Sequence, residues 1–277
     1  MTLRDELAAA PLGHATGYPD TYDASQLFAV PRAPQREAIG IAGALPFTGA
    51  DVWTAYEHTW LDSAGKPQIA ILTFAIPVAT PSIVESKSVK LYLGTFAQTR
   101  FADAAAMRAA VERDLSAATG GTVSVALVPA SDFGRLRLAE LEGDSLDALA
   151  IAVDRYDDVE PASLRASGDV VSETLRTDLF RSVCPVTGQP DYASVAIAYR
   201  GPRIDREGLL RYLVSYRLHP GFHEHCVERI FVDVMRGCRC EALAVHARFT
   251  RRGGLDINPF RSNAGAPVPE NVRTPRQ

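Results

Sequence analysis

The stretch VESKSVKLYLGTF (residues 84–96) has a counterpart in IDREGLLRYLVSY (residues 204–216), and this repetition decides how the chain divides. In both stretches an acid follows an apolar residue, a Tyr-Leu pair comes later, and a hydroxyl and an aromatic residue close the pattern. A Gly-x-Pro turn precedes each stretch, at residues 65–67 and 188–190. Matched features in the same order indicate a degenerate internal repeat and therefore two similar folding units.

The sequence around each stretch predicts the same order of secondary structure. A strand-like run follows each turn, QIAILTFAI from Gln68 and DYASVAIAY from Asp191. After the repeated stretch, apolar residues at helical spacing predict one helix in each copy, and a further strand follows at residues 123–128 and 242–249. Each half is thus predicted as β–β–α–β or a close elaboration of it.

The regions outside the repeat have the composition of connections. Prolines recur before the first copy, an acidic stretch rich in turn formers separates the copies, and the last residues are rich in Pro and Ala. We expect one strand in the separating stretch, from Leu149 to Val153. The predicted order is an irregular N-terminal extension (1–45), a first unit (46–138), a connector (139–170), a second unit (171–262) and a wrapped or mobile tail (263–277).

Composition and charge exclude several classes of protein. The chain is 47% hydrophobic and 22% charged, as in ordinary globular proteins. A formal net charge of -4 argues against a broad basic face for nucleic acid. No apolar run approaches the roughly 20 residues that span a bilayer. The N-terminus MTLRDELAAAPLG lacks a long apolar core and is a poor secretory signal. We therefore expect a cytoplasmic protein with no membrane partner and no direct nucleic-acid partner.

The usual nucleotide-binding and hydrolase motifs are missing from the sequence. There is no G-x-G, no P-loop, no H-E-x-x-H and no G-x-S-x-G. A nicotinamide cofactor, if one is used, must therefore bind on something other than a Rossmann unit. The cysteines are too few for a disulfide framework in a chain of 277 residues, which favours a reducing compartment and free thiols. They are Cys184, Cys226, Cys238 and Cys240.

Cys184 and Asp191 occur in only one of the two copies. They flank the Gly-Gln-Pro turn of the second copy in CPVTGQPD, whereas the first copy has Leu61 and Gln68 at the equivalent positions. A thiolate is a competent nucleophile, and an acid within hydrogen-bond reach can donate the proton that the attacked group needs. Taken alone the pair is a weak signal, because an isolated cysteine near a strand is more often a packing residue.

Other polar residues are also distributed unequally between the two copies. The first copy carries Glu-Ser-Lys-Ser at 85–88, where the second has Asp-Arg-Glu-Gly at 205–208. The second copy has His223 and Glu224 at the start of its helix, where the first has Ala-Asp. Neither copy holds the cysteine, the lysine motif and the histidine–glutamate pair together. We therefore interpret them as parts of one composite site shared between the halves.

Metal binding and plain surface roles are the competing interpretations. His223-Glu224-His225 and Cys226 resemble a ligand cluster, but consecutive helical residues point about 100° apart and rarely converge. Cys238-x-Cys240 lacks a second ligand pair at zinc spacing. We expect no metal site, and we place Cys226 in the core. Lys87 could belong to an ordinary solvated strand edge, and Arg252 to a surface cluster.

Taken together, five segments resemble the nitrile reductases of queuosine biosynthesis, the 7-cyano-7-deazaguanine reductases, in their long two-copy form. The likeness runs from about Tyr18 to Ser262 and is highly specific in combination. The segments are YDASQLFAVPR (22–32), ESKSVKLYL (85–93), CPVTGQPDYASV (184–195), FHEHCVERIFVDV (222–234) and RRGGLDINPFRS (251–262).

The resemblance implies a fold, an assembly and a reaction. The fold is α+β, with tandem tunnelling-fold units whose antiparallel sheets carry helices on one face, and the assembly is a homodimer. The reaction is the NADPH-dependent reduction of the nitrile of 7-cyano-7-deazaguanine to an aminomethyl group, a step toward a modified tRNA nucleoside. It proceeds through a covalent thioimidate on cysteine.

The resemblance also implies the role of each site residue. Cys184 forms the thioimidate, Asp191 protonates the nitrile nitrogen, and His223 either positions substrate or passes protons. Glu224 grips the guanine-like edge of the substrate. The cations of the cofactor site suit the phosphates of NADPH. The substrate site is lined by Val84, Glu85, Ser86, His223 and Glu224, and the cofactor site by Ser86, Lys87, Arg252 and Gly253.

Two other functions are consistent with the same fold. A related tunnelling-fold enzyme, such as a cyclohydrolase or a pterin-type synthase, commonly needs a metal-ligand set, and the scattered histidines do not supply an obvious one. A non-catalytic purine-binding or scaffold protein would need no nucleophile. The retained pair of Cys184 and Asp191 argues against that second alternative.

Overall fold

The secondary structure follows the predicted repeat. The structure is a computed structural model that describes residues 17–156 and 158–277. These residues pack as two compact units. The first contains the described residues up to Gln35 together with Asp51–Arg137 and Arg251–Asp256, and the second contains Arg36–Ala50, Leu138–Thr250 and Ile257–Gln277. The predicted domain boundaries stay a prediction. The N-terminal stretch MTLRDELAAAPLG, on which the argument against a secretory signal depends, lies outside the described residues.

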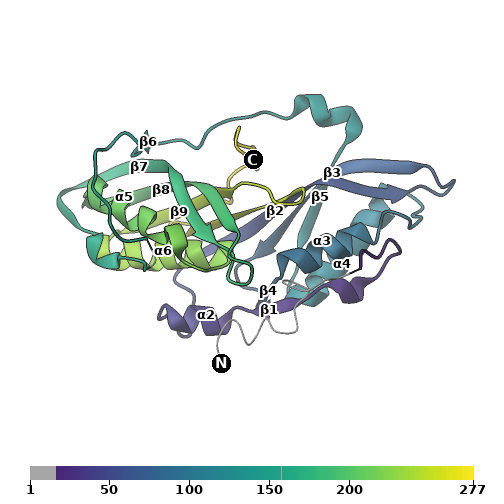
Figure 1. Cartoon of the computed structure of the whole chain (residues 1–277), viewed down its shortest axis with the longest axis horizontal. Coiled ribbons are helices and arrows are strands. Elements are labelled where there is room, and N and C mark those ends of the chain that lie inside the picture. The colour runs from purple at the N-terminus through teal and green to yellow at the C-terminus, as the bar shows by residue number, and fades with distance from the viewer. Residues whose placement is uncertain (1–16, 157) are drawn as a thin grey trace. The chain divides into compact units, whose positions relative to one another are not determined.

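The first unit combines strands in the order β5-β3-β2 with two helices and a small two-stranded sheet, β1-β4. In β3, alternate side chains are buried, as a strand with one face on a core requires. Figure 1 shows α3 and α4 running side by side in this unit. The bounds are β1 (Ala29–Pro31), β2 (Thr48–Leu61), β3 (Pro67–Pro77), β4 (Ser82–Val84), α3 (Ser86–Gly94), α4 (Ala104–Thr119) and β5 (Ser124–Pro129).

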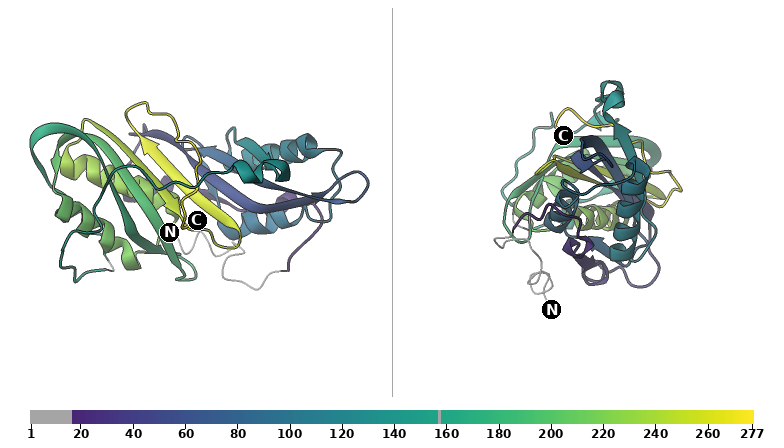
Figure 2. Two further views of the ribbon diagram at one scale, coloured as in Figure 1. Left: turned by 90° about the horizontal axis from the view of Figure 1, so that it is seen from above. Right: turned by 90° about the vertical axis from the view of Figure 1, so that its right-hand side faces the viewer.

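The second unit has strands in the order β10-β9-β8-β7-β6, antiparallel except for the β6–β7 pair. Its helices, green in Figure 2, pack against one face of these strands. The fold is thus α+β, with antiparallel sheets and helices on one face, as predicted. The bounds are β6 (Asp144–Ser145), β7 (Ala166–Val183), β8 (Pro190–Ile204), α5 (Arg206–Val214), α6 (His223–Cys238), β9 (Ala242–Phe249) and β10 (Leu255–Ser262).

A tyrosine–aspartate hydrogen bond occurs at the same place in both units and confirms the repeat. Tyr92 donates to Asp114, and Tyr212 donates to Asp233, each over 2.8 Å. The helices α4 and α6 that carry the two aspartates each have 16 residues. Burial raises the pKa of both phenols well above the ordinary value, so both remain hydrogen-bond donors.

One expectation about local structure is wrong, and so is one of the competing interpretations. Leu149–Val153 is not a strand, because the backbone N–H groups of Leu149 and Ile151 donate to carbonyls only three and two residues earlier. The pairing with β7 is made instead by β6, at Asp144–Ser145. Lys87 does not lie on a strand edge, because Glu85 caps a helix that begins at Ser86.

The regions predicted as irregular also contain short elements. In the N-terminal extension, β1 is joined by η1 (Ala24–Gln26) and by α2 (Ala33–Ala38). Further single turns are η2 (Ala130–Arg135), η3 (Pro161–Ser163) and η4 (Ser215–Leu218). The tail after Ser262 has no helix or strand, yet Thr274 and Gln277 within it are buried. It therefore wraps onto the second unit.

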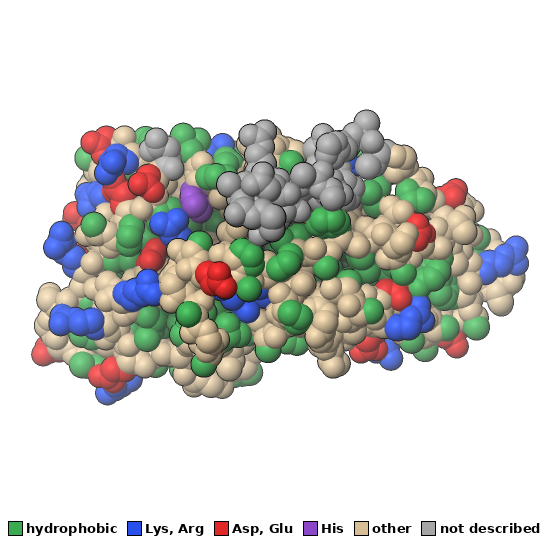
Figure 3. Space-filling view, turned by 90° about the horizontal axis from the view of Figure 1, so that it is seen from below, with side chains coloured by type: hydrophobic (Ala, Val, Ile, Leu, Met, Phe, Trp, Pro, Cys, Tyr) green, Lys and Arg blue, Asp and Glu red, His purple; other side chains and the backbone are tan. Residues whose placement is uncertain are grey.

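The surface carries charges of both signs. Acidic and basic side chains are intermixed on the face drawn in Figure 3, in agreement with the small net charge. Within residues 17–156 and 158–277, no helix is both long enough and apolar enough to cross a membrane.

Candidate active site

The β7–β8 hairpin brings Cys184 and Asp191 onto one face. Its register places Ser182 opposite Asp191, and the backbone N–H of Cys184 continues the ladder by donating to the carbonyl of Gln189 over 2.8 Å. Directly opposite residues share a face of a sheet, and diagonal neighbours are about 7–8 Å apart. Cys184 and Asp191 are such diagonal neighbours. Both are buried, with 5% and 3% of their surface exposed.

A tight turn at the end of the hairpin sets the position of Cys184. The N–H of Gly188 donates to the carbonyl of Cys184 over 3.0 Å, which closes the turn. Gly188 has a φ of 67°, in the left-handed region that glycine adopts without steric cost. The Gly-Gln-Pro sequence therefore returns the chain at once from Cys184 to Asp191.

Backbone hydrogen bonds attach the start of α6 to the end of this hairpin. Val183 donates to the carbonyl of His219 over 3.0 Å, and Gly221 donates to the carbonyl of Val183 over 3.1 Å. The first residues of the helix, His223 and Glu224, therefore lie beside the segment that leads into Cys184. Glu224 has only 1% of its surface exposed.

His223 is oriented by two contacts. Its Nε2 lies 3.3 Å from Oδ1 of Asp191, and its ring stacks on that of Phe249 with centroids 3.8 Å apart and planes 6° apart. An imidazole and a carboxyl are the side chains that most often transfer protons in active sites, and here both lie at the end of the hairpin that leads into Cys184. Cys184, Asp191, His223 and Glu224 all lie in the second unit, and their shared role in one site stays a prediction.

The other three thiols are packing groups. Burial raises the pKa of Cys226 and Cys238 to about 12 and that of Cys240 to about 11, so all three are protonated near neutral pH. Cys226 has 1% of its surface exposed, which confirms its predicted place in the core. Within the described residues, no cluster of three or more His, Cys, Asp or Glu side chains is arranged to hold a metal ion.

Glu85 caps the helix that carries the lysine motif. Its carboxylate accepts the N–H groups of Lys87 and Ser88 over 2.6 and 2.8 Å, and the side chain is fully buried. Val84, which precedes it, is also buried, whereas Ser86 and Lys87 are half-buried. The start of α3 therefore offers a hydroxyl and an ammonium group at the positive end of a helix dipole.

The turn at residues 251–254 lies against the same helix. Gly253 has a φ of 61°, and a Cβ there would lie 3.4 Å from Cδ and Cε of Lys90. The guanidinium of Arg251 sits 4.6 Å above the ring of Tyr56, and the N–H of Arg252 donates to the carbonyl of Leu255 over 2.9 Å. The first unit thus brings Val84, Glu85, Ser86, Lys87, Arg252 and Gly253 into one region.

The predicted residues therefore form two sets, one in each unit. Whether the two sets complete one composite site stays a prediction. Sequence reasoning missed Phe249, because its side chain has the pattern of an ordinary buried strand residue. It also missed the capping role of Glu85, since Ser, Thr, Asp and Asn are the usual caps.

Two family descriptions match the chain. "Nitrile reductase, 7-cyano-7-deazaguanine-reductase N-term" covers residues 18–127, and "QueF-like protein" covers residues 190–267. A solved structure, the archaeosine synthase QueF-Like in the apo form, is 20% identical with a TM-score of 0.32, over 36% of this chain and 99% of that one. A likeness of this extent does not identify a fold.

Curated relatives are similar over nearly the whole chain. Proteins named NADPH-dependent 7-cyano-7-deazaguanine reductase from Burkholderia lata and Burkholderia mallei are each 58% identical over 270 residues, and that from Burkholderia vietnamiensis is 57% identical. Each match covers 97% of this chain and 98% of the relative. These matches show that the chain belongs to the 7-cyano-7-deazaguanine reductase family of nitrile reductases.

Proposed function

We propose that this protein reduces the nitrile of 7-cyano-7-deazaguanine to an aminomethyl group with NADPH, as its relatives' names state for them. The observation that carries the proposal is the proton-holding pair of Asp191 and His223 beside the turn that bears Cys184. A nitrile needs both a nucleophile for its carbon and a proton for its nitrogen. The second unit supplies both.

The first step is the addition of the Cys184 thiol across the nitrile. Sulfur bonds to carbon, one carbon–nitrogen π pair moves to nitrogen, and Asp191 delivers the proton that nitrogen then holds. The product is a thioimidate, and Asp191 takes up the proton that the thiol loses, so the carboxyl ends the step in its starting state. His223 keeps the carboxyl of Asp191 in place and linked to a second proton-holding group. Glu224 binds the donor edge of the deazaguanine ring.

The residues around α3 suit NADPH. The donor set is a hydroxyl and two cations, from Ser86, Lys87 and Arg252, which is the chemistry that phosphates require. At Gly253 a Cβ would lie in contact with the flexible side chain of Lys90, and the positive φ of 61° favours glycine there. When bound, NADPH supplies the two successive hydrides that, with two protons, convert the nitrile to the amine and release the thiol. Val84 and Glu85 belong to the substrate side of this region.

The test is to mix the protein with 7-cyano-7-deazaguanine and follow NADPH absorbance. Two NADPH oxidised per nitrile, with loss of turnover in Cys184→Ala and retention in Cys226→Ala, is the expected result. Without NADPH, mass spectrometry should locate a substrate adduct on Cys184. No NADPH consumption by the folded protein, or an adduct on another cysteine, contradicts the proposal.

The composite arrangement and the assembly belong to the same proposal. If both units contribute to one site, Glu85→Ala will impair turnover although Cys184 lies in the other unit, and unchanged turnover argues against sharing. Family membership also supports tandem tunnelling-fold units, a homodimer and a cytoplasmic role in queuosine biosynthesis. Sedimentation at several protein concentrations measures the oligomeric state directly.

A further inference from the structure

The ring of Phe249 stacks on one face of the His223 imidazole. The two rings are nearly parallel, 6° apart, with centroids separated by 3.8 Å. This contact fixes the plane of the imidazole. The Nε2 atom lies 3.3 Å from Oδ1 of Asp191, within ion-pair range but without hydrogen-bond geometry. The stacking contact fixes the plane of the ring, and the short N···O separation places its Nε2 edge toward the carboxyl.

Phe249 is itself rigidly held by its neighbours. It has no exposed surface, and it pairs with Ala193 at the end of β9. The ring of Phe180 meets it edge-on, with centroids 5.9 Å apart and planes at 89°. The side chain of Gln277 donates from Nε2 to the carbonyl of Phe249 over 3.0 Å. Both the ring and the backbone of Phe249 are therefore fixed.

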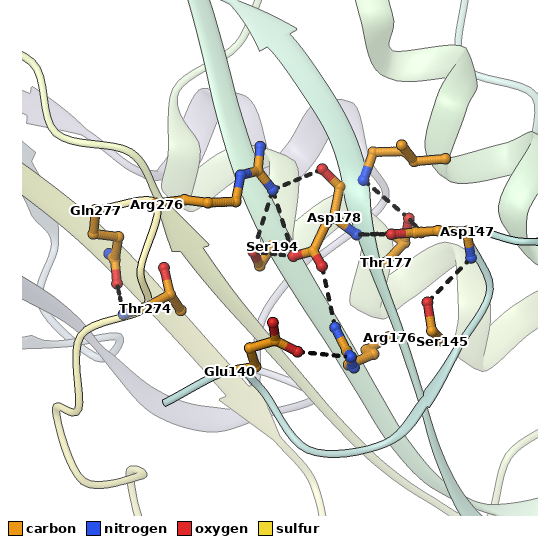
Figure 4. Close-up of polar contacts among 11 residues, drawn as sticks. Glu140, Ser145, Asp147, Arg176, Thr177, Asp178, Ser194, Thr274, Arg276 and Gln277 are labelled. Carbon is orange, nitrogen blue, oxygen red and sulfur yellow. Dashed lines mark hydrogen bonds and ion pairs between the residues drawn. The ribbon is translucent and has the colours of Figure 1, made fainter. Parts of the chain in front are cut away.

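The C-terminal residues extend this support across the sheet. Gln277 also donates to the side chain of Asn258 over 2.7 Å. Arg276 donates to the backbone carbonyl of Asp178 over 2.7 Å and contacts Ser194, as Figure 4 shows. The tail thus binds the strand that carries Phe249 and the strands that form the Cys184 hairpin. The tail therefore supports the strands that carry Cys184, Asp191 and Phe249.

We propose that Phe249 is a positioning residue that acts through His223 on Asp191; this inference rests on the proposed function. The flat contact keeps the edge of the imidazole toward the carboxyl, so Asp191 is oriented to protonate the nitrile nitrogen. Phe249 does not touch the substrate in this role. Its removal should slow formation of the Cys184 adduct and leave substrate affinity unchanged.

The experiment measures adduct formation without NADPH in Phe249→Leu, which keeps an apolar side chain but removes the ring. The rate constant is expected to fall about threefold to tenfold, the factor that one aromatic pair is worth. Substrate Kd, measured by calorimetry in a Cys184→Ala background, should stay as it is. Phe249→Tyr retains the ring and should restore most of the rate in protein that folds.

The matched control is Phe231→Leu. Phe231 is also fully buried in the second unit, but it packs edge-on against Phe47, with centroids 5.3 Å apart. It should lose stability as Phe249→Leu does while keeping the adduct rate. A wild-type rate in Phe249→Leu overturns the proposal, and so does an equal fall in both leucine variants.

A second measurement separates this inference from the proposed function. Imidazole nitrogen NMR signals of His223, assigned from a His223→Asn variant, should move in Phe249→Leu and not in Phe231→Leu. This readout needs no substrate and no turnover. If wild-type protein forms no adduct, the proposed function fails while the positioning of His223 is still tested. Unmoved His223 signals in Phe249→Leu overturn the inference.

Discussion

The carboxylate of Glu228 lies 2.9 Å from the guanidinium of Arg261, and neither side chain has any surface exposed to solvent. Arg36 contacts the same carboxylate over 2.8 Å. Glu228 belongs to α6, the helix that begins with His223. A buried carboxylate shared by two arginines therefore anchors the helix that carries part of the site.

Removing this carboxylate should destabilise the protein strongly. We expect Glu228→Gln to lower the free energy of unfolding by about 3–5 kcal/mol, because it leaves buried guanidinium charge without its partner. Urea denaturation measures the change. The control is Glu241→Gln, at an ion pair with Arg200 in which both side chains are about half exposed. That variant should change the free energy by less than about 1 kcal/mol, and equal effects would contradict the anchoring role.

Glu85 should lose both stability and activity when it is shortened. Glu85→Ala removes the acceptor for two N–H groups at the start of α3 and should cost about 1 kcal/mol. The matched control is Asp205→Ala, because Asp205 caps α5 at the equivalent position of the second unit. Thermal melting should show a loss in both variants. Turnover should fall well beyond the loss of folded protein only in Glu85→Ala.

The stability of the first unit should depend on pH through His58. Burial lowers the pKa of this imidazole to about 4, from an unfolded value of 6.5. The unfolded chain therefore binds the proton first, so stability is full above pH 6.5 and is lost as the pH falls toward 4. Between pH 7.5 and pH 5 this one group should remove about 2 kcal/mol.

His58→Leu isolates that contribution to the pH dependence. His58 has 1% of its surface exposed and contacts the sulfur of Met107. The leucine variant should lose about 2 kcal/mol less than wild type over the same pH interval, measured by urea midpoints. An identical pH dependence in the two proteins would show that the pKa of His58 is the same in the folded and unfolded states.

Alanine substitutions at two adjacent glycines can distinguish the effect of backbone strain from an effect on cofactor binding. Gly253 and Gly254 have φ values of 61° and 76°, so alanine at either is strained by about 1 kcal/mol. A Cβ at Gly253 would meet Lys90, whereas one at Gly254 has nothing within 4 Å. We expect Gly253→Ala to raise KM for NADPH severalfold and Gly254→Ala to leave it near wild type. Equal KM values for NADPH in the two variants would argue against a cofactor contact at Gly253.

Much of the fold follows from local patterns in the sequence. The strands at residues 68–76 and 242–249 and the helix that contains Met107 were predicted because their periodicity is a local property. The predicted strand at 149–153 was wrong because its N–H groups bond to nearby carbonyls. Composition alone does not reveal which of two competing sets of backbone partners is chosen.

The candidate site was only partly predictable from sequence. Cys184 and Asp191 stood out because the other copy lacks them, and the hairpin brings them to one face. Phe249 could not be identified, because its contact with His223 depends on how β9 and α6 pack together. The pairing of Arg36 with Glu228 joins residues 192 positions apart, and no local signal links them.

The hydrogen bond between Tyr92 and Asp114 is repeated between Tyr212 and Asp233, so each unit can serve as an internal control for substitutions made in the other. The two units share this internal support, whereas Cys184 stands where the first copy has Leu61. Substitutions at these equivalent tyrosines and aspartates should therefore lower stability by similar amounts in both units. Substitutions at diverged positions should not, and this asymmetry distinguishes architecture from chemistry within a single molecule.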